Sequence, residues 1–262
     1  MGVINVTPDS FSDGGRYLDP ARAVAHARDL VAAGADWLDV GGESTRPGAQ
    51  PVGDEEEQRR VLPVVEALTA EGLRVSIDTR HPAVARAAVA AGATLLNDVG
   101  ATQGDVAAEL GVAWAATHVQ GEPATMQDAP RYDDVVAEVR DLLVERAERA
   151  ARAGAPEVWI DPGIGFGKTL GHNLALLAHL DAFVATGFPV LVGTSRKAFL
   201  GRLLADSDGR HDPTPTDDRL EGSLASATWA FACGARMVRV HDVRAAAEAA
   251  QLVGGTITEA AA

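Results

Sequence analysis

The chain has 262 residues, 47% of them hydrophobic and 23% charged, so it can bury a sizeable core within one domain. Its formal net charge of -14 disfavours nucleic acid or an anionic membrane surface as the main partner. No apolar run is long enough to span a bilayer, and the single cysteine, Cys233, permits no disulfide within one chain. A cytoplasmic location follows by default, and an anionic substrate would need a local basic pocket.

Eight short apolar runs recur along the chain, and each ends on a polar side chain. Runs this short and this continuous are typical of strands that are buried on both faces, as in a parallel sheet. Packing does not explain a polar residue at every strand end, so these positions are candidate functional sites. In chain order the runs end at Asn5, Asp39, Asp78, Asn97, His118, Asp161, Ser195 and Arg239.

Alanine-rich amphipathic segments with helical spacing separate these runs. Several end on a glycine that can adopt the left-handed conformation after the last helical residue. The predicted stops are Gly34, Gly72, Gly92, Gly154 and Gly234. The predicted helices cover residues 19–33, 55–70, 82–91, 103–110, 134–153, 173–185, 198–204, 220–233 and 243–253. The polar stretch 206–218 reads as a surface excursion, and 254–262 as a frayed tail.

Strand and helix therefore alternate from end to end in eight units. Joined by right-handed crossovers, eight such units form a closed (β/α)8 barrel of about 250 residues. An open doubly wound sheet is the competing architecture, but it gathers its ligand groups at one switch point. Because polar residues here end every strand, the sequence predicts an α/β protein with a single domain, a TIM barrel over residues 1–253.

A glycine-rich segment at 162–169 looks like a phosphate-binding loop but lacks the required spacing. Pro162 stands where the pattern G-x-x-x-x-G-K-[ST] needs glycine, and Lys168 replaces the last glycine of G-x-G-x-x-G. What remains is a turn beside Asp161 that lets the backbone approach a ligand closely, with Phe166 as an apolar wall.

Three strand ends form the predicted ligand site. Asp78, Asn97 and Asp161 would face a common mouth, where two carboxylates and an amide suit a flat heterocycle with an N–H and amino edge. For Asp39, ligand binding and helix capping remain equally open.

Basic residues near the last two strands form a candidate anion site. Only two of the 23 basic residues are lysine, and one of them, Lys197, directly precedes a predicted helix N-terminus. Arg239 and His241 stand two residues apart, so strand alternation sends both in the same direction. Together with Asn5 and residues 44–46 they could hold an anionic group. Zinc-site spacing is lacking, so any metal would be Mg²⁺ bound largely by phosphate.

Seven stretches of the chain closely resemble the dihydropteroate synthase family, in family order and over essentially the whole length. They lie at residues 1–15, 39–48, 75–79, 96–99, 161–168, 195–197 and 238–243. The resemblance implies a barrel enzyme that joins 6-hydroxymethyl-7,8-dihydropterin diphosphate to 4-aminobenzoate and releases diphosphate in folate biosynthesis. It also implies Mg²⁺ as a cofactor and a homodimer.

The resemblance further assigns roles to single residues. It implies pterin binding by Asp78, Asn97, Asp161 and Lys197. It implies diphosphate binding by Asn5, Arg239 and His241, with Asn5 as the metal ligand. The aminobenzoate would lie against Thr45, Arg46, Pro47 and Phe166. The expected catalytic residues are Asp78, Asp161, Lys197 and Arg239, which would stabilise the charges that develop as the diphosphate departs.

Two other functions remain open at this point. One is a pterin-binding module of the methyltransferase type, which serves a corrinoid protein and shares the barrel and the pterin carboxylates. The other is a catalytically impaired pterin-binding paralogue. This second alternative stays open because of Ala198, where many relatives of the family have serine, and because of the short segment 100–112.

Overall fold

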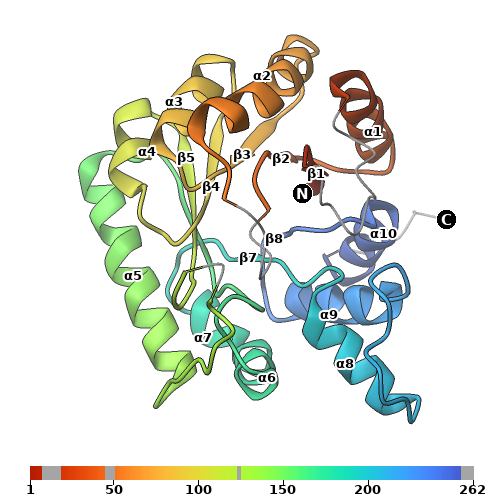
Figure 1. Ribbon diagram of the computed structural model, residues 1–262. Helices are drawn as coiled ribbons and strands as arrows, with labels where there is room; N and C mark the ends of the chain where they lie inside the picture. Colours follow the sequence, from red (N-terminus) through yellow and green to blue (C-terminus); the bar gives the residue numbers. More distant parts are fainter. Residues whose placement is uncertain (8–18, 45–50, 123–124, 255–262) are drawn as a thin grey trace, which may run out of the picture.

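The computed structural model describes residues 1–7, 19–44, 51–122 and 125–254, in which strands and helices alternate around a central ring (Figure 1). The strands are β1 (Gly2–Asn5), β2 (Leu38–Gly41), β3 (Val75–Asp78), β4 (Leu95–Val99), β5 (Ala113–Thr117), β6 (Val158–Asp161), β7 (Leu191–Val192) and β8 (Met237–Val238). The helices are α1 (Pro20–Ala32), α2 (Asp54–Ala70), α3 (Pro82–Ala90), α4 (Gly104–Leu110), α5 (Val135–Ala153), α6 (Leu170–Ala178), α7 (Leu180–Val184), α8 (Ala198–Ser207), α9 (Leu220–Ala232) and α10 (Val243–Gly254).

All of the paired strands run parallel. Strands β1 to β6 form one sheet in chain order, and β7 pairs with β8. Single bridges join the two sheets, because Gly2 pairs with Val240 beyond β8, and Ile160 of β6 pairs with Val190 before β7. Eight parallel strands thus surround one interior, and the predicted (β/α)8 architecture is confirmed.

Strand alternation divides the buried residues into two cores. Side chains on the outer face, such as Ile4, Ile77 and Ile160, pack against the surrounding helices. Those on the inner face form a second, smaller cluster at the amino end of the ring. Its members are Met1, Trp37, Leu95, Ala113, Ala115, Trp159, Leu191 and Met237. In several of these strands the next inward residue, two positions later, is polar. The apolar cluster therefore forms the floor of the barrel interior, and polar side chains line its carboxyl end.

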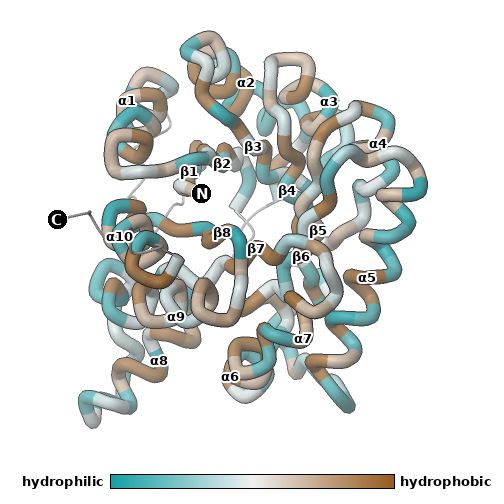
Figure 2. The backbone as a smooth tube through the Cα atoms, turned by 180° about the vertical axis from the view of Figure 1, so that it is seen from behind, coloured by the Kyte–Doolittle hydropathy of each residue, from teal (hydrophilic) through white to brown (hydrophobic). Residues whose placement is uncertain are grey.

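The helices follow the predicted boundaries closely, and their amphipathic character is visible along the outer ring in Figure 2. The prediction of a single helix over residues 173–185 is wrong. The helical region begins earlier, at Leu170, and is divided at His179 into α6 and α7. The early start comes from a capping box in which Thr169 Oγ1 accepts from His172 N at 3.2 Å and His172 Nδ1 accepts from Thr169 N at 3.3 Å. Histidine replaces the usual Glu or Gln, so the sequence pattern did not reveal it.

Two further boundaries differ from the prediction. Helix α8 extends through Ser207, so the surface excursion begins later than residue 206, and α10 includes Gly254, the first residue of the predicted tail. The rest of that tail lies outside the described residues. The five predicted glycine stops all have positive φ, between 74° and 106°. No helix in the described ranges is both long and apolar enough to cross a lipid bilayer.

Gly163, in the turn after β6, offers a direct test of backbone packing. A Cβ placed there would lie 1.8 Å from the carbonyl oxygen of His118, whereas a Cβ at Gly72 would meet nothing within 4 Å. Both glycines have a similar left-handed φ, 66° and 74°, so alanine suffers the same backbone strain at each. We expect Gly163→Ala to lower the melting temperature clearly more than Gly72→Ala, by thermal denaturation followed by circular dichroism. Equal losses would mean that the turn can move away from β5.

Candidate active site

Polar side chains from five strands meet at the carboxyl end of the ring. Asp78 of β3 and Asn97 of β4 are paired in register, and Asp39 lies on β2 opposite Ser76, two residues before Asp78. Asp161 ends β6 and Arg239 follows β8 directly. The active sites of (β/α)8 enzymes lie at this end of the barrel.

Arg239 links the last strand to the second and third. Its Nε donates to Asp39 Oδ2 at 2.5 Å and its Nη2 donates to Asp78 Oδ2 at 2.8 Å. Asp39 is fully buried, and its Oδ1 has no hydrogen-bond partner among the described residues. The guanidinium therefore supplies the charge that compensates a buried carboxylate.

Asn97 is held from both ends of its amide. Its Nδ2 donates to Asp39 Oδ2 at 3.0 Å, and its Oδ1 accepts from Thr117 Oγ1 at 3.4 Å. Only 2% of Asn97 is exposed. The residue is thus placed at the predicted site, with its orientation fixed by Asp39 and β5.

Asp161 and Lys197 approach each other across Gly193. A Cβ built on Gly193 would lie 3.8 Å from Asp161 Oδ2, from Lys197 Nζ and from Arg239 Cβ alike. Asp161 Oδ1 accepts from Gly163 N at 2.7 Å, which orients the carboxylate. The space above Gly193 is therefore bordered by one carboxylate and two cations.

Burial perturbs the ionisation of these groups in opposite directions. It raises the pKa of Asp78, which Arg239 opposes, and it raises the pKa of Asp161, which Lys197 opposes. Burial lowers the pKa of Lys197 to about 8, against the attraction of Asp161. Desolvation opposes a charged Arg239 as well, but Asp39 and Asp78 outweigh it and raise the pKa of Arg239. A ligand that donates hydrogen bonds to Asp161 would favour its charged form.

His241, the second basic residue of the predicted anion site, contacts Ser195 in the segment after β7. His241 Nδ1 lies 3.0 Å from Ser195 Oγ, and that oxygen also accepts from His241 N at 3.1 Å.

Asn5, at the end of β1, lies opposite Gly41 in register. Among the described residues there is no group of three or more His, Cys, Asp or Glu that could hold a metal ion. An amide oxygen with phosphate oxygens suits a hard cation such as Mg²⁺, so Asn5 fits a metal held mainly by substrate.

Of the four residues predicted to border the arylamine, Phe166 is described. Its ring centroid lies 4.1 Å from Lys197 Nζ, next to the cluster. The other three, Thr45, Arg46 and Pro47, lie outside the described residues. The residues on either side of that segment are tied together, because Glu43 Oε1 accepts from Val52 N at 3.0 Å and Glu43 pairs with Arg80 Nε at 2.8 Å.

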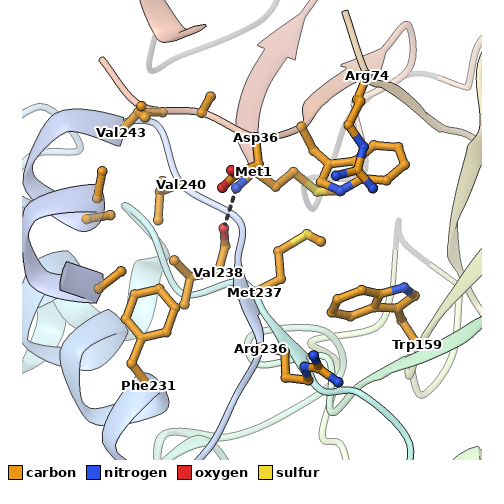
Figure 3. Close-up of a pocket in the computed structure, with 16 residues that line it drawn as sticks. Met1, Asp36, Arg74, Trp159, Phe231, Arg236, Met237, Val238, Val240 and Val243 are labelled. Carbon is orange, nitrogen blue, oxygen red and sulfur yellow. Dashed lines mark hydrogen bonds between the residues drawn. The ribbon is translucent and has the colours of Figure 1, made fainter. Parts of the chain in front are cut away.

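A cavity of about 330 Å³ lies at the opposite, amino end of the barrel (Figure 3). It is bordered by the apolar floor residues Trp37, Trp159 and Met237, and Arg74 stacks on the Trp37 ring at 4.1 Å. The predicted site residues are absent from its lining. The carboxyl end, with its converging charges, remains the candidate active site.

Comparison with known proteins shows the family of the chain. The family profile described as pterin binding enzyme matches residues 1–241. The chain is 50% identical to the dihydropteroate synthase of Mycobacterium leprae and 45% identical to that of Escherichia coli, covering 97% and 98% of this chain and 92% and 91% of those proteins. The chain belongs to the dihydropteroate synthase family.

Solved structures of the family share the fold. The Yersinia pestis synthase, in complex with a sulfonamide drug, superposes with a TM-score of 0.90 at 42% identity, covering 97% of this chain and 92% of that one. The Thermus thermophilus synthase has been solved with 4-aminobenzoate, with a TM-score of 0.84 at 48% identity, and with 6HMPPP, with a TM-score of 0.79 at 46% identity. The match with the 4-aminobenzoate complex covers 97% of this chain and 92% of the Thermus thermophilus chain. The match with the 6HMPPP complex covers 96% and 91%.

Three contacts at this synthase site were not foreseen. Asp39 caps no helix: its side chain accepts from Arg239 and Asn97, so the capping interpretation is wrong. Lys168 and His118, from the turn after β6 and the end of β5, form a buried pair at 2.9 Å. Position at a strand end was the available signal for Asp39 and His118, whereas the identity of their partners depends on how the strands and the turns after them come together in space.

Proposed function

We propose that the protein condenses 6-hydroxymethyl-7,8-dihydropterin diphosphate with 4-aminobenzoate, forming 7,8-dihydropteroate and diphosphate for folate biosynthesis. The observation that carries this proposal is the convergence of Asp78, Asp161, Lys197 and Arg239 on one space at the carboxyl end of the barrel. Carboxylates suit the N–H and amino edge of a pterin, and cations suit its diphosphate. The binding of 6HMPPP and 4-aminobenzoate by the Thermus thermophilus relative supports the same pair of substrates.

The charges in the cluster suit a reaction in which the diphosphate leaves before the amine attacks. The C–O bond breaks with its electron pair on the diphosphate, and positive charge develops on the pterin methylene. Asp78 and Asp161 stabilise that charge, while Arg239 and His241 stabilise the leaving group. The neutral arylamine nitrogen then forms the new C–N bond and loses a proton to solvent or diphosphate. Little acid or base catalysis is required, since the nucleophile is already uncharged.

Asn5 would hold Mg²⁺ together with the substrate diphosphate. When bound, the metal would neutralise part of the charge on the departing group. We expect chelation of Mg²⁺ by EDTA to reduce the affinity for pterin diphosphate in wild type and to matter less in Asn5→Ala.

Asp161→Asn is expected to weaken pterin binding by about 10- to 100-fold, the range for losing a hydrogen bond to a charged group. An amide offers one acceptor oxygen, and Gly163 N already occupies a carboxylate oxygen in the wild type. Calorimetry with a pterin that lacks the diphosphate measures this effect. Inorganic pyrophosphate provides the control, because its affinity should not fall. Unchanged pterin affinity would reject the assignment of Asp161.

Turnover is expected to fall as the pH rises above about 8. In the folded protein the pKa of Lys197 is lowered from 10.5 to about 8, so the ammonium is present below that pH and lost above it. Lys197→Arg should move this limb of the kcat/KM profile to higher pH, because a guanidinium keeps its proton. An identical basic limb in the arginine variant would assign the titration to another group.

We also propose that the protein works as a homodimer in the cytoplasm. Helix α9 carries two large exposed hydrophobic residues, Trp229 at 50% and Leu220 at 42%, which support contact with a second copy. Sedimentation of the wild type and of Leu220→Glu tests the dimer, since a buried glutamate should shift the population to monomer. A wild-type monomer at micromolar concentration would contradict it.

The experiment that tests the proposed function is diphosphate release by the purified protein. With pterin diphosphate, 4-aminobenzoate and Mg²⁺ we expect steady release and formation of dihydropteroate. Diphosphate release that does not depend on the arylamine, or no release at all, would instead favour a pterin-binding paralogue without synthase activity.

A further inference from the structure

We infer that Lys168 is a positioning residue for the arylamine substrate: its buried amino group holds the backbone carbonyl of Phe166, and thereby sets the position of the Phe166 ring beside Lys197. The inference rests on the proposed function, in which Phe166 borders the aminobenzoate. Lys168 itself would not touch either substrate.

The Lys168 side chain is buried, and its amino group has two hydrogen-bond partners. Only 3% of the residue is exposed, and its Nζ lies 3.0 Å from Phe166 O and 2.9 Å from His118 Nδ1. His118 is also buried, and desolvation lowers the pKa of its ring to about 3, so the ring is neutral. Burial also lowers the pKa of Lys168 to about 7. An N–H of Lys168 Nζ can donate to His118 Nδ1 in either protonation state of the lysine, provided that the ring proton resides on Nε2. The pair therefore connects the end of β5 to the turn after β6.

Four successive carbonyls of this turn each accept from a different side chain. Ile164 O accepts from Lys197 Nζ and Phe166 O from Lys168 Nζ. On either side of Phe166, Gly165 O accepts from Gln127 Nε2 at 2.6 Å and Gly167 O accepts from Tyr132 OH at 3.0 Å. The bond from Lys168 belongs to the carbonyl of Phe166 itself, the residue that presents a ring to the site.

The same turn lies directly on the backbone that follows β5. A Cβ at Gly167 would lie 2.2 Å from Gln120 O, and a Cβ at Gly163 would lie 1.8 Å from His118 O. With so little space beneath it, the turn cannot move toward that backbone, so any displacement of Phe166 has to be a shift away from it or along it. The Lys168 to Phe166 bond opposes that shift.

Removal of this bond should affect one substrate more than the other. Asp161, which would hold the pterin, is oriented separately by Gly163 N, whereas Phe166 has its ring 4.1 Å from Lys197 Nζ. We therefore expect the arylamine KM to respond strongly and the pterin affinity weakly.

The test compares Lys168→Met, Lys168→Arg and wild type in steady-state kinetics. Methionine keeps an unbranched stem without donors, and it should raise the KM for 4-aminobenzoate by about tenfold or more, with kcat and the Kd of pterin diphosphate changed by less than about threefold. Arginine retains donors for Phe166 O and should recover at least part of the KM. An unchanged arylamine KM, an equal loss for both substrates, or an arginine variant no better than methionine would overturn the inference.

Thr69→Val serves as the control for a lost side-chain bond far from the site. Thr69 Oγ1 donates to Ala91 O at 2.7 Å between α2 and α3, and its loss should lower the melting temperature without changing either substrate constant. If Lys168→Met does not fold, His118→Leu removes the other partner of Lys168 and should raise the arylamine KM with the same selectivity. Equal effects on both substrates in that variant would again overturn it.

Wild-type turnover separates this inference from the proposed function. If the wild type shows no release of diphosphate that depends on the arylamine, the proposed function fails and the inference fails with it. If the wild type turns over normally while Lys168→Met shows no selective loss, the inference alone fails.

Discussion

Arg239→Ala is expected to lower the free energy of unfolding by about 3 kcal/mol, the low end of the range for breaking a buried ion pair. The guanidinium bonds to Asp39 and Asp78, and Asp39 is fully buried. Without Arg239 the Asp39 carboxylate would be left without a counter-charge. The low end applies because 22% of the Arg239 side chain is exposed to solvent. The loss should appear as an earlier urea midpoint at an unchanged slope.

Arg236 provides the matched control for Arg239. It lies three residues earlier, is exposed, and should tolerate alanine with a change of about 0.5 kcal/mol or less. From the sequence alone, Arg239→Ala is expected to weaken mainly diphosphate binding. The contacts of Arg239 in the structure predict that the variant loses both stability and diphosphate affinity. A variant of wild-type stability would mean that the buried Asp39 carboxylate does not depend on Arg239 for its compensation.

Lys197→Ala is expected to reduce kcat/KM by about 100- to 1,000-fold, the effect of removing one preorganised charge from an active site. Its Nζ projects into the space above Gly193, near Asp161, and donates to Ile164 O in the turn after β6. No ion pair among the described residues depends on it, so the melting temperature should change little. The measurement is steady-state kinetics together with thermal denaturation of the same preparation.

Arg196, the adjacent cation, is the control for Lys197. Its Nη2 pairs with Asp242 Oδ1 at 2.6 Å, whereas Lys197 Nζ lies beside Gly193 and donates to Ile164 O. Arg196→Ala should keep turnover within about threefold of wild type. Comparable activity losses in both variants would show that the segment 195–197 acts through its backbone rather than through the Lys197 charge.

Much of the site could be predicted because strand alternation is a local property. If the side chain of Trp159 points inward, that of Asp161 two residues later must also point inward. The same holds for Met237 and Arg239, independently of the rest of the chain. Apolar runs that end on polar residues therefore revealed both the barrel and its mouth. The family relationship, which the comparisons support, also disfavours the methyltransferase-type alternative.

Contacts across the ring could not be predicted in the same way. The bond from Arg239 to Asp39 joins residues 200 positions apart, and it exists only because β8 closes onto β1 and brings β2 within reach. The burial of Lys168 depends likewise on the turn after β6 lying against the end of β5. Sequence identifies Asp39, His118 and Arg239 as polar strand ends, and the three-dimensional arrangement of the strands and turns determines their partners.

A crystal structure of the protein with 6-hydroxymethyl-7,8-dihydropterin diphosphate would show directly at which end of the barrel the substrate binds. We predict the pterin ring within hydrogen-bond distance of Asp161 and its diphosphate beside Arg239 and His241, at the carboxyl end of the strands. A pterin bound in the cavity between Trp37 and Trp159 would instead place the active site at the amino end of the barrel.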